Sequence, residues 1–160
     1  MIFVSTGSRK FQFNRLLQTL DELVEQGVIK DDVFAQIAES TYLPKHYQYT
    51  RYLSPEEFSK YQNEAYLIIS HAGTGALISA LKKGKQVIAV PRLAKYKEHS
   101  DDHQIQISGV LAEEGYLRQV LDMNELGTAV VESFETPIQK KYDKPSNIVS
   151  IIDEQINRWF

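Results

Sequence analysis

A glycine-rich stretch is the part of this sequence whose residue types best suit chemistry. Residues 68–75 read Ile-Ile-Ser-His-Ala-Gly-Thr-Gly, an apolar run that breaks into small residues just before a segment with helical periodicity. A helix that begins with so little side-chain bulk presents free backbone N–H groups and the positive end of its dipole, and both suit a phosphate group. The residues that we expect to form this phosphate cradle are His71, Ala72, Gly73, Thr74 and Gly75.

The glycines of this stretch do not follow the two best-known phosphate-binding patterns. No Gly-Lys-Ser or Gly-Lys-Thr follows Gly75, so this is not a Walker loop. Leu77 and Ile78 stand where the dinucleotide fingerprint requires its third glycine. A structural alternative is that the small residues only allow tight packing of strand and helix, and that His71 only caps the strand. The sequence therefore predicts either a phosphate site of a less familiar kind or a purely structural turn.

A second polar stretch, residues 91–104, carries the charge that a diphosphate would need. It reads Pro-Arg-Leu-Ala-Lys-Tyr-Lys-Glu-His-Ser-Asp-Asp-His-Gln, and its basic residues are Arg92, Lys95 and Lys97. Basic side chains supply counter-charge to phosphate oxygens. The polar residues that open the next helix, a set that can donate to and accept from sugar hydroxyls, are Asp102, His103 and Gln104. The alternative is that the acidic residues only favour a helix N-terminus and that the basic residues line a solvated loop.

Histidine and serine residues raise two further possibilities. His99 and His103 are four residues apart and share one face if both lie on a helix. With His71 they define a metal-dependent hydrolase as an alternative. That alternative lacks an HExxH arrangement and any cysteine ligand, so we expect no bound metal and no cofactor. Ser8 and Ser70 lack the Gly-x-Ser-x-Gly elbow of a nucleophilic serine, and we expect no hydrolase triad.

Apolar patterning predicts alternating strands and helices along the whole chain. Short apolar runs predict strands near residues 2–4, 32–38, 48–53, 66–70, 86–90 and 116–120. Helical periodicity, capping residues and glycine stops predict helices near residues 13–26, 54–63, 74–83, 100–114, 123–132 and 145–159. This alternation is typical of an α/β domain with a mostly parallel sheet and helices on both faces.

The loops that follow three of the predicted strands should meet at one edge of the sheet. In an open parallel sheet, ligands bind outside the carboxyl ends of the strands, and residues 5–10, 71–75 and 91–104 all leave such ends. The first loop adds Gly7 and Ser8 to the candidate residues. We therefore expect one ligand site at this edge, built from three polar or glycine-rich loops.

Composition restricts the class of protein. A chain of 160 residues suits one domain, which we place at residues 1–160, and a net charge of −3 argues against broad nucleic-acid binding. There is no cysteine, and the apolar runs fall far short of the roughly 20 residues that cross a bilayer, so we expect a cytoplasmic protein. The segment 145–160 is amphipathic and ends in Trp159 and Phe160, which suits docking on the domain itself, on a partner or at a membrane interface.

Three spaced motifs resemble one known family. They are residues 70–75 (Ser-His-Ala-Gly-Thr-Gly), 85–92 (Lys-Gln-Val-Ile-Ala-Val-Pro-Arg) and 102–104 (Asp-His-Gln). Together they are similar to the C-terminal, donor-binding half of family 28 glycosyltransferases, whose members have two Rossmann-like lobes. Residues 1–15 extend the resemblance over nearly the whole chain. More closely, the chain resembles split forms in which this half is a separate subunit, as in capsule and exopolysaccharide synthesis and in the eukaryotic dolichol-linked N-acetylglucosaminyltransferase.

The resemblance implies a donor site for a nucleotide sugar, a UDP-hexose above all. By that match the turn at 73–75 holds the diphosphate and the stretch 102–104 contacts the donor sugar. The loop at Gly7 and Ser8 would face the cleft between the lobes. The resemblance further implies inverting transfer without a bound metal, in which the helix dipole and basic side chains stabilise the leaving diphosphate. Galactose, glucuronic acid, glucose and N-acetylglucosamine all fit this pattern.

The chain departs from the family pattern in one residue and in its extent. Many relatives carry an acidic residue eight positions after the histidine, where it holds the ribose hydroxyls, and this chain has Ser79 there. The chain also corresponds to one lobe of two, so the resemblance implies that a membrane-associated partner supplies the general base and binds a lipid-linked acceptor. We expect a hexosyltransferase subunit that is weak or inactive alone. The alternative is a non-catalytic module that only activates such a partner.

Overall fold

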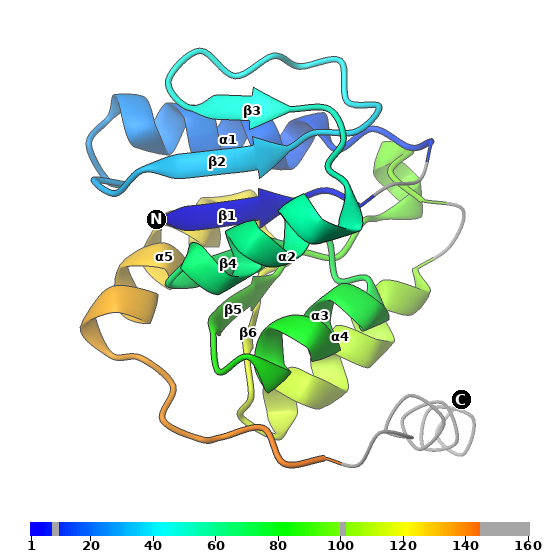
Figure 1. Cartoon of the computed structure of the whole chain (residues 1–160). Coiled ribbons are helices and arrows are strands. Elements are labelled where there is room, and N and C mark those ends of the chain that lie inside the picture. Colours follow the sequence, from blue (N-terminus) through cyan, green and yellow to red (C-terminus); the bar gives the residue numbers. More distant parts are fainter. Residues whose placement is uncertain (8–9, 100–101, 145–160) are drawn as a thin grey trace.

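A six-stranded parallel sheet forms the centre of the protein (Figure 1). The computed structural model describes residues 1–7, 10–99 and 102–144. Its strands are β1 (Ile2–Ser5), β2 (Val33–Gln36), β3 (Gln48–Thr50), β4 (Leu67–Ser70), β5 (Gln86–Ala89) and β6 (Arg118–Gln119). They lie in the order β3-β2-β1-β4-β5-β6, and every neighbouring pair runs parallel. This doubly wound arrangement confirms the predicted α/β fold.

Helices cover both faces of the sheet. They are α1 (Asn14–Glu25), α2 (Pro55–Glu64), α3 (Thr74–Lys82), α4 (His103–Glu113) and α5 (Leu126–Glu135), with short 3-10 helices η1 (Ala94–Tyr96) and η2 (Met123–Glu125). Helices α1 and α5 pack on one face, and α2, α3 and α4 pack on the other (Figure 1). In the described part of the chain no helix is long and apolar enough to cross a bilayer. The helix predicted at 145–159 lies outside the described residues, so its docking role stays a prediction.

Burial on both faces explains why the central strands read as continuous apolar runs. Every residue of β1 and β4 is buried, because helices cover both sides of the sheet. Val4 and Ile69 face the core beneath α1 and α5, whereas Phe3 and Ile68 face the core beneath the other three helices. Burial of each such side chain stabilises the fold by roughly 1.5–3 kcal/mol. The two cores therefore fix the strands whose ends carry the site.

Helix α4 differs from the helix predicted at 100–114 in both its start and its buried face. It begins at His103, and η1 occupies part of the loop before it. Helical periodicity alone predicts a buried face of Ile105, Ser108, Leu111 and Ala112. The residues that are buried in the structure are Ile107, Ser108, Val110 and Leu111. Since the helix is apolar on more than one side, its contacts with α3 and β6 select the buried face, which periodicity alone does not.

A buried carboxylate fastens the connection between β2 and β3 to α1. The side chain of Asp21 accepts hydrogen bonds from Tyr42 Oη at 2.6 Å and from Lys45 N at 2.8 Å. It also accepts from His46 N at 2.8 Å and lies 3.0 Å from His46 Nδ1. Burial disfavours the charged carboxyl, but these hydrogen bonds outweigh burial and hold the pKa of Asp21 below its ordinary value. One carboxylate thus fixes residues 42–46 of this connection against α1.

Candidate functional site

Three connections meet at the carboxyl edge of the sheet, where the sequence predicted a ligand site. In the register of the sheet Ser5 lies beside Ser70, and Ser70 lies beside Ala89, so β1, β4 and β5 end at one level. The connections that follow these strands therefore start side by side (Figure 1). Ser8, in the first of them, lies outside the described residues, and its part in the site stays a prediction.

The ring of His71 joins the first two connections. A Cβ atom on Gly7 would lie 2.8 Å from His71 Nε2, and a Cβ atom on Gly73 would lie 2.3 Å from it. The ring therefore fills the space that both missing side chains would need. Gly7 also has a φ of +83°, in the left-handed region that favours glycine. The structural explanation thus accounts for Gly7 and Gly73, because His71 requires both.

Gly75 is different, because no neighbour requires its lack of a side chain. A Cβ atom there would meet nothing within 4 Å. It lies in the first turn of α3, where the N-cap residue Gly73 makes no side-chain capping bond. A hydrogen bond from Leu77 N to Gly73 O, at 3.0 Å, opens the helical ladder, so the N–H groups of residues 74–76 have no acceptor within the helix. Together with the helix dipole they form an uncrowded place for an anion.

The turn that leads into α3 is strained. Ala72 has a φ of 69°, a left-handed value that costs an alanine roughly 1–2 kcal/mol, and the residue is fully buried. Ser70, the last residue of β4, is also buried. Thr74, the first residue of α3, is half-buried. Strain of this kind persists only where the surroundings fix the backbone, and it gathers at functional sites. The strain therefore indicates a turn that is held in one geometry.

An ion pair clamps the third connection, between β5 and α4, onto α1. Arg15 donates to Glu98 twice, from Nε to Oε2 and from Nη2 to Oε1, each at 3.0 Å. The Glu98 side chain is 1% exposed, and its Oε1 atom also accepts from Leu93 N at 3.0 Å. Arg15 further donates to the backbone oxygens of Pro91 at 3.3 Å and Leu121 at 3.2 Å. One side chain of α1 thus holds the segments that follow β5 and β6.

Arg15 and Glu98 shape the site, although sequence reasoning did not find either of them. They are 83 residues apart in the sequence, so no local pattern pairs them. Gln12 adds to the same clamp, since its Nε2 atom donates to Tyr96 O at 3.0 Å. The guanidinium of Arg15 also lies over the ring of Tyr96, 4.7 Å from its centroid. The clamp becomes visible only once the sheet brings α1 beside the end of β5.

The structure gives the predicted residues of this third connection a scaffold role. The Arg92 side chain is fully buried, with its guanidinium 5.5 Å from the centroid of the Phe13 ring. Its backbone N–H donates to Gln104 Oε1 at 3.1 Å, and Ala94 N donates to Asp102 Oδ1 at 2.9 Å. The basic side chains of the loop that are exposed are Lys95 and Lys97, and His103 is exposed at the start of α4. Contact of these residues with a donor sugar stays a prediction.

Two further positions bear on the sequence-based alternatives. Ser79, which stands where relatives carry an acid, donates from its hydroxyl to Gln62 Oε1 at 3.1 Å and so turns toward α2. His103 Nδ1 lies 3.3 Å from Gln106 Oε1. Among residues 1–7, 10–99 and 102–144, no three histidine, aspartate or glutamate side chains gather as a set of metal ligands.

The fold and the family of this chain follow from comparison with known proteins. The sequence matches the profile of the "Glycosyltransferase family 28 C-terminal domain" over residues 1–156. A search of curated protein sequences finds no significant match. Among solved structures, the NMR structure of ALG13 is 17% identical, with a TM-score of 0.60 over 95% of this chain and 94% of that one.

Two larger proteins share the fold over part of their length. MurG from Acinetobacter baumannii is 17% identical, with a TM-score of 0.58 over 96% of this chain and 49% of that one. The UDP-GlcNAc 2-epimerase from Neisseria meningitidis, bound to UDP-GlcNAc, is 12% identical, with a TM-score of 0.63 over 98% and 43%. The chain spans about two fifths of the length of several such structures. On the profile match over nearly its whole length, the chain belongs to the family of the glycosyltransferase family 28 C-terminal domain.

Proposed function

We propose that this chain is the donor-binding subunit of an inverting glycosyltransferase that uses a UDP-hexose. The observation that carries the proposal is the bare N-terminus of α3, where Gly75 leaves open space beside three backbone N–H groups. Family membership supports a glycosyltransferase role. A structural neighbour that is bound to UDP-GlcNAc supports a uridine diphosphate sugar as the ligand class.

The proposed chemistry assigns charge stabilisation to this chain. An acceptor hydroxyl attacks the anomeric carbon of the sugar while the bond from that carbon to the diphosphate oxygen breaks. The proton of the hydroxyl passes to a general base, and the negative charge remains on UDP. The N–H groups of residues 74–76 and the exposed ammonium groups of Lys95 and Lys97 would stabilise that charge. Arg92, being buried, would support the loop and not the ligand directly.

A membrane-associated partner completes the proposed enzyme. Gly75 is exposed, so a diphosphate at this edge would meet water, and water weakens the stabilisation of charge. A partner lobe placed over the edge would exclude that water, supply the general base and bring a lipid-linked acceptor for polysaccharide synthesis. We expect the isolated chain to bind UDP but to transfer sugar slowly. Rapid transfer to a lipid-linked acceptor by the purified chain alone would contradict the partner requirement.

Calorimetric titration with UDP tests the donor site. We expect saturable binding to the wild-type chain and no binding to Gly75→Asp, which places a side chain and a negative charge at the cradle. Gln139→Asp is the matched control, because it adds the same charge at an exposed position after α5, near the amino ends of the strands. If Gly75→Asp bound UDP as tightly as the control, the site would have to lie elsewhere.

Ser79 favours a second candidate, a module that binds no nucleotide and only activates its partner. The Ser79 hydroxyl already donates a hydrogen bond to Gln62. The side chain is also too short to take the place of a carboxylate that accepts hydrogen bonds from the ribose hydroxyls. The titration separates the two functions. Absence of UDP binding at millimolar concentration, in protein that is folded by circular dichroism, would favour the activator module over the donor subunit.

A further inference from the structure

A groove runs between α1 and α5 on the face of the sheet opposite α3 and α4. One hollow, of about 660 Å³, is shared by α1, η2 and α5. A second, of about 400 Å³, continues it toward the amino ends of the strands and shares Val28, Val131 and Glu135 with the first. A third, at the carboxyl edge, shares Thr19, Glu22 and Met123 with the first. We call this continuous surface the α1–α5 groove.

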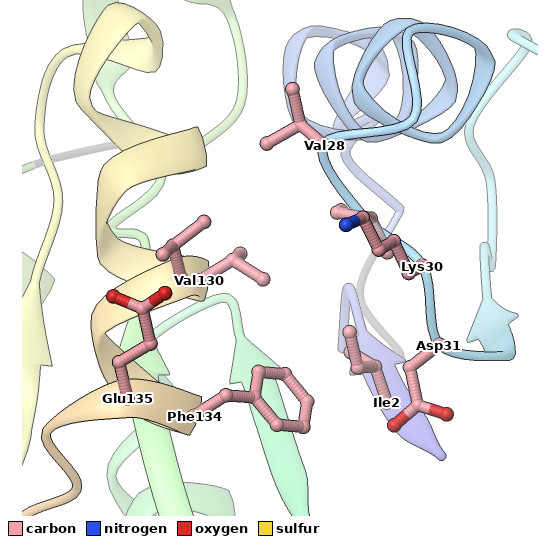
Figure 2. Close-up of a pocket in the computed structure, with 9 residues that line it drawn as sticks. Ile2, Val28, Lys30, Asp31, Val130, Phe134 and Glu135 are labelled. Carbon is pink, nitrogen blue, oxygen red and sulfur yellow. The ribbon is translucent and has the colours of Figure 1, made fainter.

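The floor of the α1–α5 groove is apolar. Val28 is 38% exposed and Phe134 is 40% exposed, although both are large apolar residues. Figure 2 shows Val28, which follows α1, and Phe134 of α5 on opposite sides of the opening, with Ile2 at its base. Leu23 and Val131 continue the apolar floor between the helices. Large apolar side chains that stay exposed around one opening suit contact with another apolar surface.

Close contact of the two helices closes the groove at its base. A Cβ atom on Gly127, in α5, would lie only 3.1 Å from Leu23 Cδ2, in α1. The two helices therefore approach each other closely at this glycine. The result is a trough with two helical walls, into which one further helix can place an apolar stripe. A helix as long as the 12-residue α1 would span about 18 Å of it.

The rim of the central hollow is acidic, whereas the hollow at the carboxyl edge also carries Arg15 and Lys95. Among the described residues that line the central hollow, the charged ones are Glu22, Glu132 and Glu135, and none is basic. Arg118 pairs with Glu132 at 3.9 Å, at the side of the hollow, and does not line it. Lys30 and Asp31, at the amino end, offset one another in charge. An occupant of the central hollow therefore gains from positive charge beside its apolar stripe.

Charge and chain path argue against two occupants that this chain itself could supply. A second copy of the same groove would bring a second acidic rim against the first. The C-terminal stretch 145–160 carries Asp153 and Glu154 against Arg158. The chain also leaves the groove after α5, since Ile138 N donates to Gln86 at 2.9 Å and Lys144 pairs with Glu114 at 3.1 Å. It is thus fastened beside α4, on the other face (Figure 1).

We infer that the α1–α5 groove binds a cationic amphipathic helix of a partner protein. The inference rests on the proposed function in taking the membrane-associated subunit as the source of that helix. The cytoplasmic flanks of membrane helices are rich in lysine and arginine, which complements the acidic rim. The groove also reaches the carboxyl edge, where the partner lobe would sit, so one continuous interface covers both.

Site-specific fluorescence in the full chain tests the groove. The chain has no cysteine, so Thr128→Cys, on the wall of the central hollow, takes a single bimane label. Lys60→Cys, exposed on α2, carries the control label. The probes are two amphipathic peptides of about 12 residues, matched to the length of α1, one of leucine and lysine and one of leucine and glutamate. We expect the lysine peptide to change only the Thr128→Cys signal, and the glutamate peptide to change neither.

Charge reversal supplies the second measurement. Glu22→Lys combined with Glu135→Lys should weaken binding of the lysine peptide by about tenfold or more, because two rim charges change sign. Glu25→Lys, an exposed residue of α1 that does not line the groove, should change the affinity far less. Equal binding of both peptides, equal response of both labels or indifference to charge reversal would overturn the inference.

Two further outcomes would replace the proposed occupant. A Thr128→Cys signal that changes with protein concentration would assign the groove to a second copy. A signal that changes in the full-length variant Ile152→Asp without any peptide would assign it to the C-terminal stretch. A UDP titration of the same samples keeps the two proposals apart: UDP binding with no peptide binding overturns the groove alone, and the reverse overturns the donor site alone.

Discussion

The two connections that border the proposed donor site are held in opposite ways. The turn into α3 depends on missing side chains, because the His71 ring fills the space beside Gly7 and Gly73. The loop between β5 and α4 depends on side chains that are present, above all the Arg15–Glu98 ion pair. The comparison shows that one edge of a sheet can combine a preformed backbone anion site with a loop fixed from a distant helix.

The largest effect should come from breaking the clamp. Glu98→Ala leaves Arg15 without its carboxylate partner in a buried setting, which we expect to lower the free energy of unfolding by about 3 kcal/mol. Urea denaturation measures this change. Glu56→Ala, which removes an exposed glutamate of α2, is the control. As a surface change, it should lower the free energy of unfolding by well under about 1 kcal/mol. Similar values for the two variants would mean that the ion pair does not hold the loop.

A smaller effect should follow from filling the space beside His71. A Cβ atom on Gly73 would lie 2.3 Å from the ring, so Gly73→Ala must displace the ring or the turn. We expect a loss of about 2 kcal/mol, as for other overpacked sites, together with loss of UDP binding. Thermal unfolding and calorimetry measure the two effects. A variant of unchanged stability would show that the ring is free to move aside.

Gly75→Ala should separate stability from binding. Open space surrounds that position, and alanine is the better helix former by about 1 kcal/mol, so stability should stay level or rise. UDP affinity should fall, because the methyl group stands where we place the diphosphate. Loss of stability in Gly75→Ala would reveal a packing role that the structure does not show.

Features that depend on neighbouring residues could be predicted from the sequence, whereas contacts between distant residues could not. The alternation of strands and helices, the glycine turn and the start of α2 after its N-cap Ser54 follow from local patterns, since each depends on residues close together in the chain. The clamp and the Asp21 contacts do not, because they join residues that lie far apart in the sequence. Sequence reasoning could name Arg92 as a basic residue, but only the fold shows that Phe13 and the loop enclose it.

The smallest effect should be a pH dependence of stability that comes from Asp21, which holds the β2–β3 connection against α1. The pKa of Asp21 is lowered in the folded protein, so its contribution to stability is complete above the unfolded pKa of about 3.9 and is lost as pH falls through the lower folded value. We expect stability to decline below about pH 4, and less steeply in Asp21→Asn. Denaturation at several pH values measures both slopes. Parallel slopes would remove Asp21 from the explanation.

The most direct test of the donor site is the set of backbone amide shifts on titration with UDP. An isotope-labelled chain of 18.4 kDa suits heteronuclear NMR, which reports each N–H group separately. We expect the largest shifts at the amides of residues 74–76 and at Gly7, with little change along α1 and α5. No shifts at millimolar UDP, or shifts concentrated in the central hollow between α1 and α5, would contradict this expectation.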